Sequence, residues 1–90
     1  MTLLRDNAAA RRFEMHEDGH TVFADYRRSD GRLIIDHVEA PPALRGTGAA
    51  GRFMEALANH AQASGEKITP LCAYAATWLR RHAEYRDLIV

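Results

Sequence analysis

Apolar and polar positions alternate along the first half of the chain, and a helical spacing replaces this alternation in the second half. Three β-prone segments, residues 12–16, 21–27 and 32–39, are separated by Asp18-Gly19 and Asp30-Gly31. Asp-Gly pairs between such segments predict tight hairpins, because both residues tolerate positive φ. The pattern therefore predicts three antiparallel strands in a meander.

The third predicted strand is apolar on both faces near its start, where Leu33, Ile34 and Ile35 follow one another. Such a run is typical of an interior strand that is covered on both sides. Ala40-Pro41-Pro42 ends the strand, because proline has no amide hydrogen for a ladder and restricts the residue before it.

Helical spacing begins at about Ala49 and ends at Ser64-Gly65, a typical helix stop. One face of this helix carries the apolar residues, which are Phe53, Met54, Leu57, Ala58 and Ala61. Residues 67–72 predict a short strand whose ladder is interrupted at Pro70. Residues 73–82 predict a second helix.

The two ends of the chain are less regular. The last residues either add a strand or pack against the core, and the alanines at 8–10 either begin a helical turn or are frayed. The predicted strand–helix–strand step implies a parallel pair of strands. At 90 residues the chain has room for one domain, residues 1–90, of the α+β class with a mixed sheet.

Composition narrows the classes of function. Twelve basic residues balance twelve acidic ones, which argues against binding to nucleic acid. No apolar run approaches the roughly 20 residues that a membrane span needs, and the first residues lack the apolar middle of a signal peptide. The one cysteine, Cys72, cannot form an internal disulfide or a zinc site. We therefore expect a cytoplasmic protein without a metal.

A glycine-rich loop follows the third strand and leads into the first helix. Residues 46–51 match G-x-G-x-x-G, and Glu66 lies about twenty residues further on, as in a dinucleotide-binding fingerprint. We reject this interpretation, because a dinucleotide loop leaves a parallel strand directly, whereas Pro41-Pro42 and several further residues intervene here.

The same loop is suited to another anion. Small residues let backbone amides approach a ligand closely, and a helix N-terminus supplies unpaired donors and partial positive charge. A pyrophosphate in any cofactor would fit such a loop. The alternative is that the glycines only turn the chain.

Several motifs in this chain occur together, in the same order, in a known family. Arg45-Gly46-Thr47-Gly48-Ala49-Ala50 fits the pattern R/Q-x-x-G-x-G/A. Around it stand His37-Val38-Glu39-Ala40-Pro41, then Pro70-Leu71-Cys72-Ala73-Tyr74, then Arg81-His82-Ala83-Glu84-Tyr85. In these stretches, over residues 33–90, the sequence resembles the GNAT superfamily of acyl-CoA-dependent N-acetyltransferases, and in particular its small single-domain branch.

The resemblance implies a GNAT-like fold with acetyl-CoA as co-substrate. It places the pyrophosphate on the backbone amides of Gly46, Thr47, Gly48, Ala49 and Ala50, and the pantetheine arm between the third and fourth strands, which splay apart in this superfamily. The chain is short for the superfamily. We expect it to lack the usual N-terminal strand and much of the helical region that shapes an acceptor pocket.

Acetyl transfer to an amine needs a base, an oxyanion donor and a proton for the leaving thiolate. His37 is the first candidate for the base, because it titrates near neutrality, and strand alternation places Glu39 on the same face. The alternative is a histidine that only bonds a neighbour. An unpaired backbone amide near Val38 or Glu39 is the candidate oxyanion donor.

Cys72 has three interpretations: a small buried side chain, an acid for the thiolate, or an acetyl acceptor in a two-step reaction. Tyr74 is the rival acid, since GNAT proteins often carry a tyrosine on the helix after the fourth strand. Arg45 and Arg81 are candidates for contacts with the phosphates, whereas an arginine near a helix end can also simply oppose the helix dipole.

Three functions compete at this point. The first is an acetyl-CoA-dependent N-acetyltransferase that acts on a primary amine, by direct attack in a ternary complex. The second is a coenzyme A-binding module with little catalysis, and the third is an interaction domain that has lost the ligand. We expect a monomer or a weak dimer, because an exposed edge strand can pair with a copy of itself.

Overall fold

A computed structural model describes residues 3–90, so Met1 and Thr2, the start of the segment searched for a signal peptide, lie outside the described residues. The chain forms one five-stranded sheet with the strand order β1-β2-β3-β4-β5. Its strands are β1 (Arg5–Asn7), β2 (Arg12–Glu17), β3 (His20–Ser29), β4 (Arg32–Glu39) and β5 (Lys67–Pro70). Neighbours from β1 to β4 are antiparallel, and β4 and β5 are parallel, as the strand–helix–strand step predicts.

The remaining elements are helical. They are α1 (Ala49–Ser64) and α2 (Ala73–Arg81), with the 3-10 helices η1 (Ala8–Ala10), η2 (Pro42–Leu44) and η3 (Ala83–Leu88). The η1 turn confirms that the alanines near the N-terminus begin a helical turn. Within residues 3–90 no helix is both long and apolar enough to cross a membrane.

The meander is held by the two predicted Asp-Gly turns. Asp18 and Gly19 have φ of 49° and 77°, and Asp30 and Gly31 have φ of 51° and 77°. Two successive residues with positive φ form the turn whose twist matches the flanking strands. The turn chemistry therefore fixes the register of both hairpins, and the three predicted strands are confirmed.

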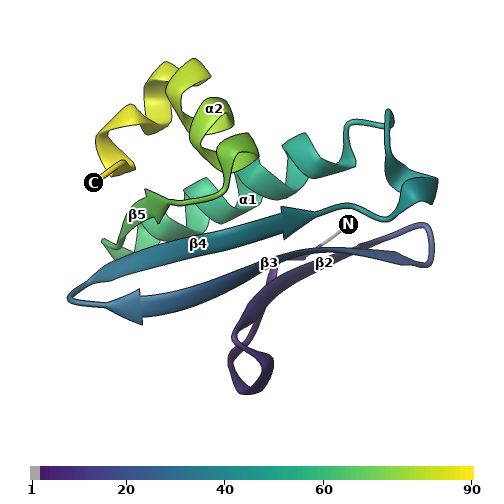
Figure 1. Cartoon of the computed structure of the whole chain (residues 1–90), viewed down its shortest axis with the longest axis horizontal. Coiled ribbons are helices and arrows are strands. Elements are labelled where there is room, and N and C mark those ends of the chain that lie inside the picture. The colour runs from purple at the N-terminus through teal and green to yellow at the C-terminus, as the bar shows by residue number, and fades with distance from the viewer. Residues whose placement is uncertain (1–2) are drawn as a thin grey trace.

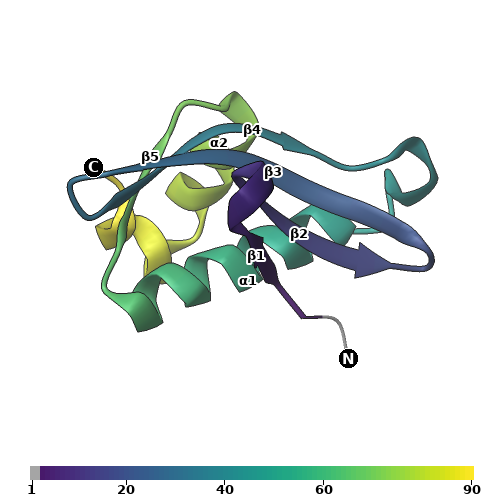
Figure 2. The same cartoon turned by 90° about the horizontal axis from the view of Figure 1, so that it is seen from below.

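The helices lie on one face of the sheet, where they enclose the core (Figures 1 and 2). Phe53, Met54, Leu57, Ala58 and Ala61 of α1 are all fully buried, as the helical spacing predicts. Helix α1 ends at Gly65, whose φ of 74° is the left-handed conformation that favours glycine.

The opposite face of the sheet has no helix over it among the described residues (Figure 2). Leu33 and Ile35 of β4 point into the core and are fully buried, whereas Ile34 is only half-buried. Strand β4 is therefore interior in the sheet, but the expectation that both of its faces are covered is wrong.

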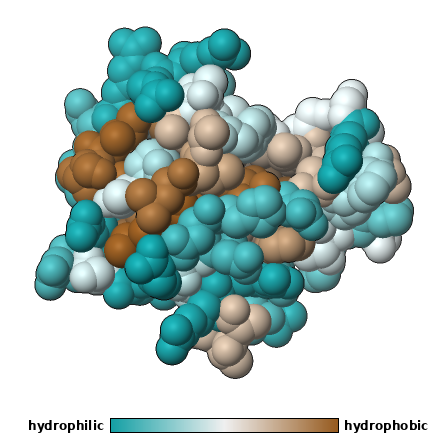
Figure 3. All heavy atoms as spheres, in the orientation of Figure 1, coloured by the Kyte–Doolittle hydropathy of each residue, from teal (hydrophilic) through white to brown (hydrophobic). Residues whose placement is uncertain are grey.

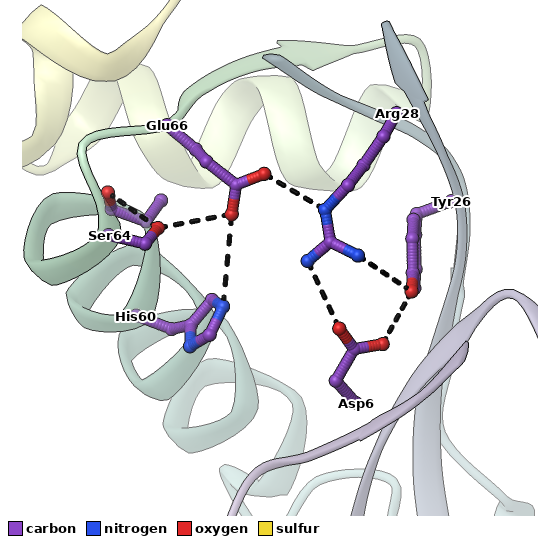
Figure 4. A network of polar contacts seen from close by, with 7 residues as sticks. Asp6, Tyr26, Arg28, His60, Ser64 and Glu66 are labelled. Carbon is purple, nitrogen blue, oxygen red and sulfur yellow. Dashed lines mark hydrogen bonds and ion pairs between the residues drawn. The ribbon is translucent and has the colours of Figure 1, made fainter. Parts of the chain in front are cut away.

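The chain has an N-terminal strand, β1. The expectation that this strand is missing, which came from the resemblance to longer GNAT proteins, is therefore wrong. Asp6 of this strand accepts hydrogen bonds from the Tyr26 hydroxyl and from Arg28, at 3.0 Å in the second case (Figure 4). Arg28 also donates to Glu66 at 2.9 Å. The strand has three polar residues and no apolar alternation, so its pairing depends on this network, which the sequence pattern does not reveal.

Changing Asp6 to alanine is expected to lower the free energy of unfolding by about 1–3 kcal/mol, because Tyr26 is 5% exposed and its hydroxyl loses its carboxylate partner. Glu55→Ala is the control, since Glu55 is an exposed helix residue and its removal should change stability by less than about 0.5 kcal/mol. Urea unfolding of both variants tests this. Equal midpoints for the two would contradict a structural role for the β1 network.

The C-terminal residues both pack against the core and extend the sheet. After η3, Ile89 forms an isolated parallel bridge with Ile68, and the Val90 amide donates to the Ile68 carbonyl at 3.0 Å. Apolar surface gathers at this end of the molecule, around β5 and the C-terminus (Figure 3). Leu71 and Val90 are 60% and 56% exposed.

Candidate active site

Strands β4 and β5 separate halfway along β4, as the resemblance implied. Their pairing ends at Ile35 and Pro70, and the amides of Leu71 and Cys72 both donate to the Ile35 carbonyl, at 3.0 and 3.2 Å. Proline has no amide hydrogen to continue the ladder. Beyond this point, no strand among residues 3–90 pairs with residues 36–39 of β4 on their β5 side, so the backbone edge there is open.

A β-bulge in β4 decides which amide faces the open edge. Asp25 pairs with His37 and Tyr26 with Ile35, so Asp36 is the extra residue. The Tyr26 amide donates to Arg11 on the β2 side at 3.0 Å, and backbone groups alternate in direction along a strand. Ala24 therefore also points to β2, and Val38, which lies opposite Ala24, directs its amide away from β3 to the open edge.

This open edge borders a cavity of about 280 Å³. The cavity brings together several residues that were predicted separately from the sequence. It is lined by His37, Val38, Glu39 and Ala40 of the β4 segment, Arg45 and Ala50 of the glycine loop and α1, and Tyr74 of α2.

His37 and Glu39 lie on the same face, as predicted. The His37 Nε2 is 3.2 Å from a carboxylate oxygen of Glu39, and both side chains are about half exposed. His37 also lies edge-on to the Phe23 ring, with centroids 6.4 Å apart. A carboxylate at this distance can orient the imidazole ring through a hydrogen bond.

The two candidate acids differ in position. Tyr74 lines the cavity and is 43% exposed, and burial raises the pKa of its phenol, with a smaller contribution from the neighbouring Cys72. Cys72 precedes α2, is half-buried and packs against the core cluster, and it does not line the cavity. Of the two candidates, Tyr74 is thus the one at the cavity, whereas Cys72 packs against the core.

The glycine loop leaves some of its backbone donors free. The Thr47 amide donates to Leu44 at 3.2 Å, and the Ala49 amide donates to the Thr47 hydroxyl at 3.3 Å. Within residues 3–90, the amides of Gly46, Gly48 and Ala50 have no hydrogen-bond acceptor. Thr47 and Ala49 thus brace the loop, while the other three amides remain able to bind a ligand.

Gly48 adopts a special backbone conformation among these donors. Its φ of 84° is left-handed, and it immediately precedes α1. Arg52 donates to the Thr47 carbonyl at 3.0 Å and also pairs with Glu17, which lowers the pKa of the Glu17 carboxyl. The Arg52 side chain therefore fastens the loop to the end of β2.

The two candidate phosphate-binding arginines lie in different places. Arg45 lines the cavity and donates to the Ala40 carbonyl at 3.3 Å. Arg81 is exposed in the last turn of α2, seven residues and about 10 Å along the helix from Tyr74. Only Arg45 is thus brought to the cavity.

The dinucleotide interpretation is excluded by the structure. Glu66 follows the C-terminal end of α1, at the opposite end of the helix from the glycine loop, and is paired with Arg28. The strands before the loop are antiparallel. Across residues 3–90, no group of three or more histidine, cysteine, aspartate or glutamate side chains is placed to hold a metal.

The sequence reasoning did not single out Asp36 or Arg27. The Arg27 guanidinium donates two hydrogen bonds to the Asp36 carboxylate, at 2.9 and 2.8 Å, and holds the pKa of that carboxyl below its usual value. Alternation from buried Leu33 and Ile35 would place the polar His37 on the core side, and this mismatch is the signal that could have indicated a bulge.

The splayed parallel pair, the bulge and the glycine loop surround the candidate site, and the family model that matches the chain gives its class. Residues 12–88 match the family model described as GCN5-related N-acetyl-transferase, and the chain belongs to this family. A search of curated protein sequences found no match.

One solved structure that resembles this chain comes from Staphylococcus aureus. It is an NMR solution structure described as a "GCN5-like putative N-acetyltransferase". The two chains share 22% sequence identity with a TM-score of 0.67, and the match covers 97% of this chain and 86% of the other. At this identity the likeness demonstrates the fold, which is the α+β mixed sheet predicted from the sequence.

Proposed function

We propose that this protein is an acetyl-CoA-dependent N-acetyltransferase that acts on a primary amine. The observation that carries the proposal is the open edge of β4 beside the cavity, where Val38 directs its amide outward. Membership of the family supports acetyl transfer in general. The residues that line the cavity supply the groups that this reaction would need.

The described residues fit a coenzyme A thioester. The free amides of Gly46, Gly48 and Ala50 at the start of α1 would hold the pyrophosphate, and Arg45 beside them would add a positive charge. The open backbone edge of β4 would pair with the amide groups of the pantetheine arm. When bound, the thioester supplies an activated acetyl group.

The residues around the cavity would each have a separate role in acetyl transfer. The Val38 amide would donate to the thioester carbonyl oxygen and stabilise the negative charge that develops there. His37, directly or through a water molecule, would accept the proton that the amine loses as its nitrogen bonds the acetyl carbon. The Tyr74 hydroxyl would donate a proton to the coenzyme sulfur as the carbon–sulfur bond breaks.

Two measurements separate the competing functions. Titration calorimetry with acetyl-CoA is expected to give saturable binding, and absence of binding at millimolar ligand would overturn the proposal. Release of free thiol is then measured with a panel of primary amines. We expect turnover that His37→Ala lowers by about a hundredfold and that Cys72→Ala leaves within about threefold. Binding without turnover by any amine would leave only a coenzyme A-binding module.

A further inference from the structure

The bulge in β4 gathers charged groups on the uncovered face of the sheet. Asp25 lies opposite His37, and Asp36 is the extra residue beside them. Asp25 receives two hydrogen bonds from Arg12, at 3.3 and 3.2 Å. Asp36 receives two from Arg27. Each carboxylate at the bulge therefore has an arginine of its own.

Without the bulge, β3 and β4 would continue in the regular register that they follow from Ser29 to Tyr26. Asp25 would then face Asp36 directly, and two carboxylates opposite each other on neighbouring strands repel. Every later side chain of β4 would change faces. His37 would point into the core, and its amide instead of the Val38 amide would face the open edge.

The Arg27–Asp36 pair is built across this register shift. Arg27 lies opposite Ile34, so its guanidinium reaches diagonally past Ile35 to the bulged residue. Two parallel hydrogen bonds from one guanidinium constrain the carboxylate in direction as well as in distance. Asp36 points to the outer face in both registers, so the pair can form in either one, and it holds the charged carboxylate where Asp25 would meet it in the regular register.

We propose that the Asp36 carboxylate, held by Arg27, excludes the regular register, in which it would face Asp25, and thereby positions Val38 and His37 at the cavity. Arg27 and Asp36 are positioning residues, since neither lines the cavity. The consequence for catalysis rests on the proposed acetyltransferase function. The consequence for the register does not, and the two are tested separately.

The register is measured by NMR on the protein without ligand. In the parent, cross-strand contacts should join Asp25 to His37 and Ala24 to Val38. Asp36→Ala should shift a measurable share of molecules to the regular register, with Ala24 beside His37. Asp36→Glu, which keeps a carboxylate that would face Asp25 in the regular register, should retain the bulged pattern. If Asp36→Ala keeps the parent contacts in full, the proposal is wrong, whatever the activity.

The kinetic test compares kcat with acetyl-CoA affinity. Losing one oxyanion donor lowers kcat by about 10²–10³, so shifted molecules contribute almost no turnover, and kcat of Asp36→Ala should fall in proportion to the share of molecules that NMR finds shifted. Its acetyl-CoA affinity should fall less, because the glycine loop is unchanged, and Asp36→Glu should keep most of the parent rate. Glu66→Gln is the control: it removes an ion pair with Arg28 far from the cavity, and its kcat should stay within about twofold of the parent.

The outcomes are distinguishable. A parent that binds no acetyl-CoA overturns the proposed function, while the NMR result still decides the register. A variant with shifted contacts and unchanged kcat overturns the positioning role. A parallel loss of kcat in Glu66→Gln would mean that the effect of Asp36→Ala reflects general destabilisation, which also contradicts the proposal.

Discussion

Changing Tyr74 to phenylalanine should lower kcat for acetyl transfer by about a hundredfold or more, because this phenol is the acid assigned to the leaving thiolate. The change removes one oxygen from a side chain that is 43% exposed and lines the cavity. Acetyl-CoA affinity should stay within about threefold, since the amides of the glycine loop are untouched. Steady-state rates and calorimetry on the same samples measure both quantities.

The matched control is Tyr85→Phe. Tyr85 is another phenol with a pKa raised mainly by burial, but its hydroxyl donates to Asn59 at 2.8 Å. Its loss should lower the free energy of unfolding by about 1 kcal/mol and leave kcat nearly unchanged. If Tyr74→Phe were no slower than Tyr85→Phe, the acid assignment would be wrong, and Cys72 would become the remaining candidate.

The raised pKa of Tyr74 also sets the direction of a pH effect. Burial favours the neutral phenol, so Tyr74 stays protonated at every pH below its ordinary value of 10.0 and for some way above it. The contribution of Tyr74 to kcat is therefore present at neutral pH and lost only as pH rises through the raised pKa. The same sign holds for stability: unfolding exposes the phenol, which then ionises more easily, so stability falls above about pH 10.

The second large effect is expected at Gly48. Gly48→Ala should lower acetyl-CoA affinity by about tenfold or more and cost about 1–2 kcal/mol of stability, because alanine disfavours a φ of 84°. The added Cβ would also lie 3.0 Å from the Arg52 guanidinium, which holds the Thr47 carbonyl. Relaxation of this φ would turn the loop amides away from the ligand.

Gly51 provides the comparison within the same glycine-rich segment. Gly51 lies in α1, its φ is not positive, and an added Cβ would make an ordinary contact of 3.7 Å with the Trp78 indole nitrogen. Gly51→Ala should therefore stabilise the helix by about 0.5–1 kcal/mol and preserve affinity. Opposite signs for the two alanine variants, in thermal unfolding and in calorimetry, are the expected result. Equal losses would show that the loop only turns the chain.

Local patterns were sufficient for most of the elements. The hairpin turns follow from the positive φ that Asp18-Gly19 and Asp30-Gly31 accept, and α1 follows from the spacing of its buried face. Strand β1 was missed, because three polar residues carry no alternation, and its contacts with Tyr26 and Arg28 come from distant parts of the chain.

The site residues predicted from the sequence fall into two groups, those that line the cavity and those that do not. His37, Val38, Arg45 and Tyr74 were named from motifs, and the fold brings them to one cavity. Cys72 and Arg81 were named on the same grounds, yet neither lines it. Motif spacing cannot separate these two groups, because whether a side chain reaches a cavity depends on the angle at which its helix or strand is packed.

What the sequence by itself determined was the order of elements, the turns between them and the chemistry available in each motif, since these depend on neighbours a few residues apart. Only the tertiary structure decided which amide of β4 is open. Strict alternation from Leu33 and Ile35 would send His37 to the core. The register shift opposite Asp25 turns His37 to the outer face instead. The register depends on how two strands pair with each other, so the sequence of neither strand determines it alone.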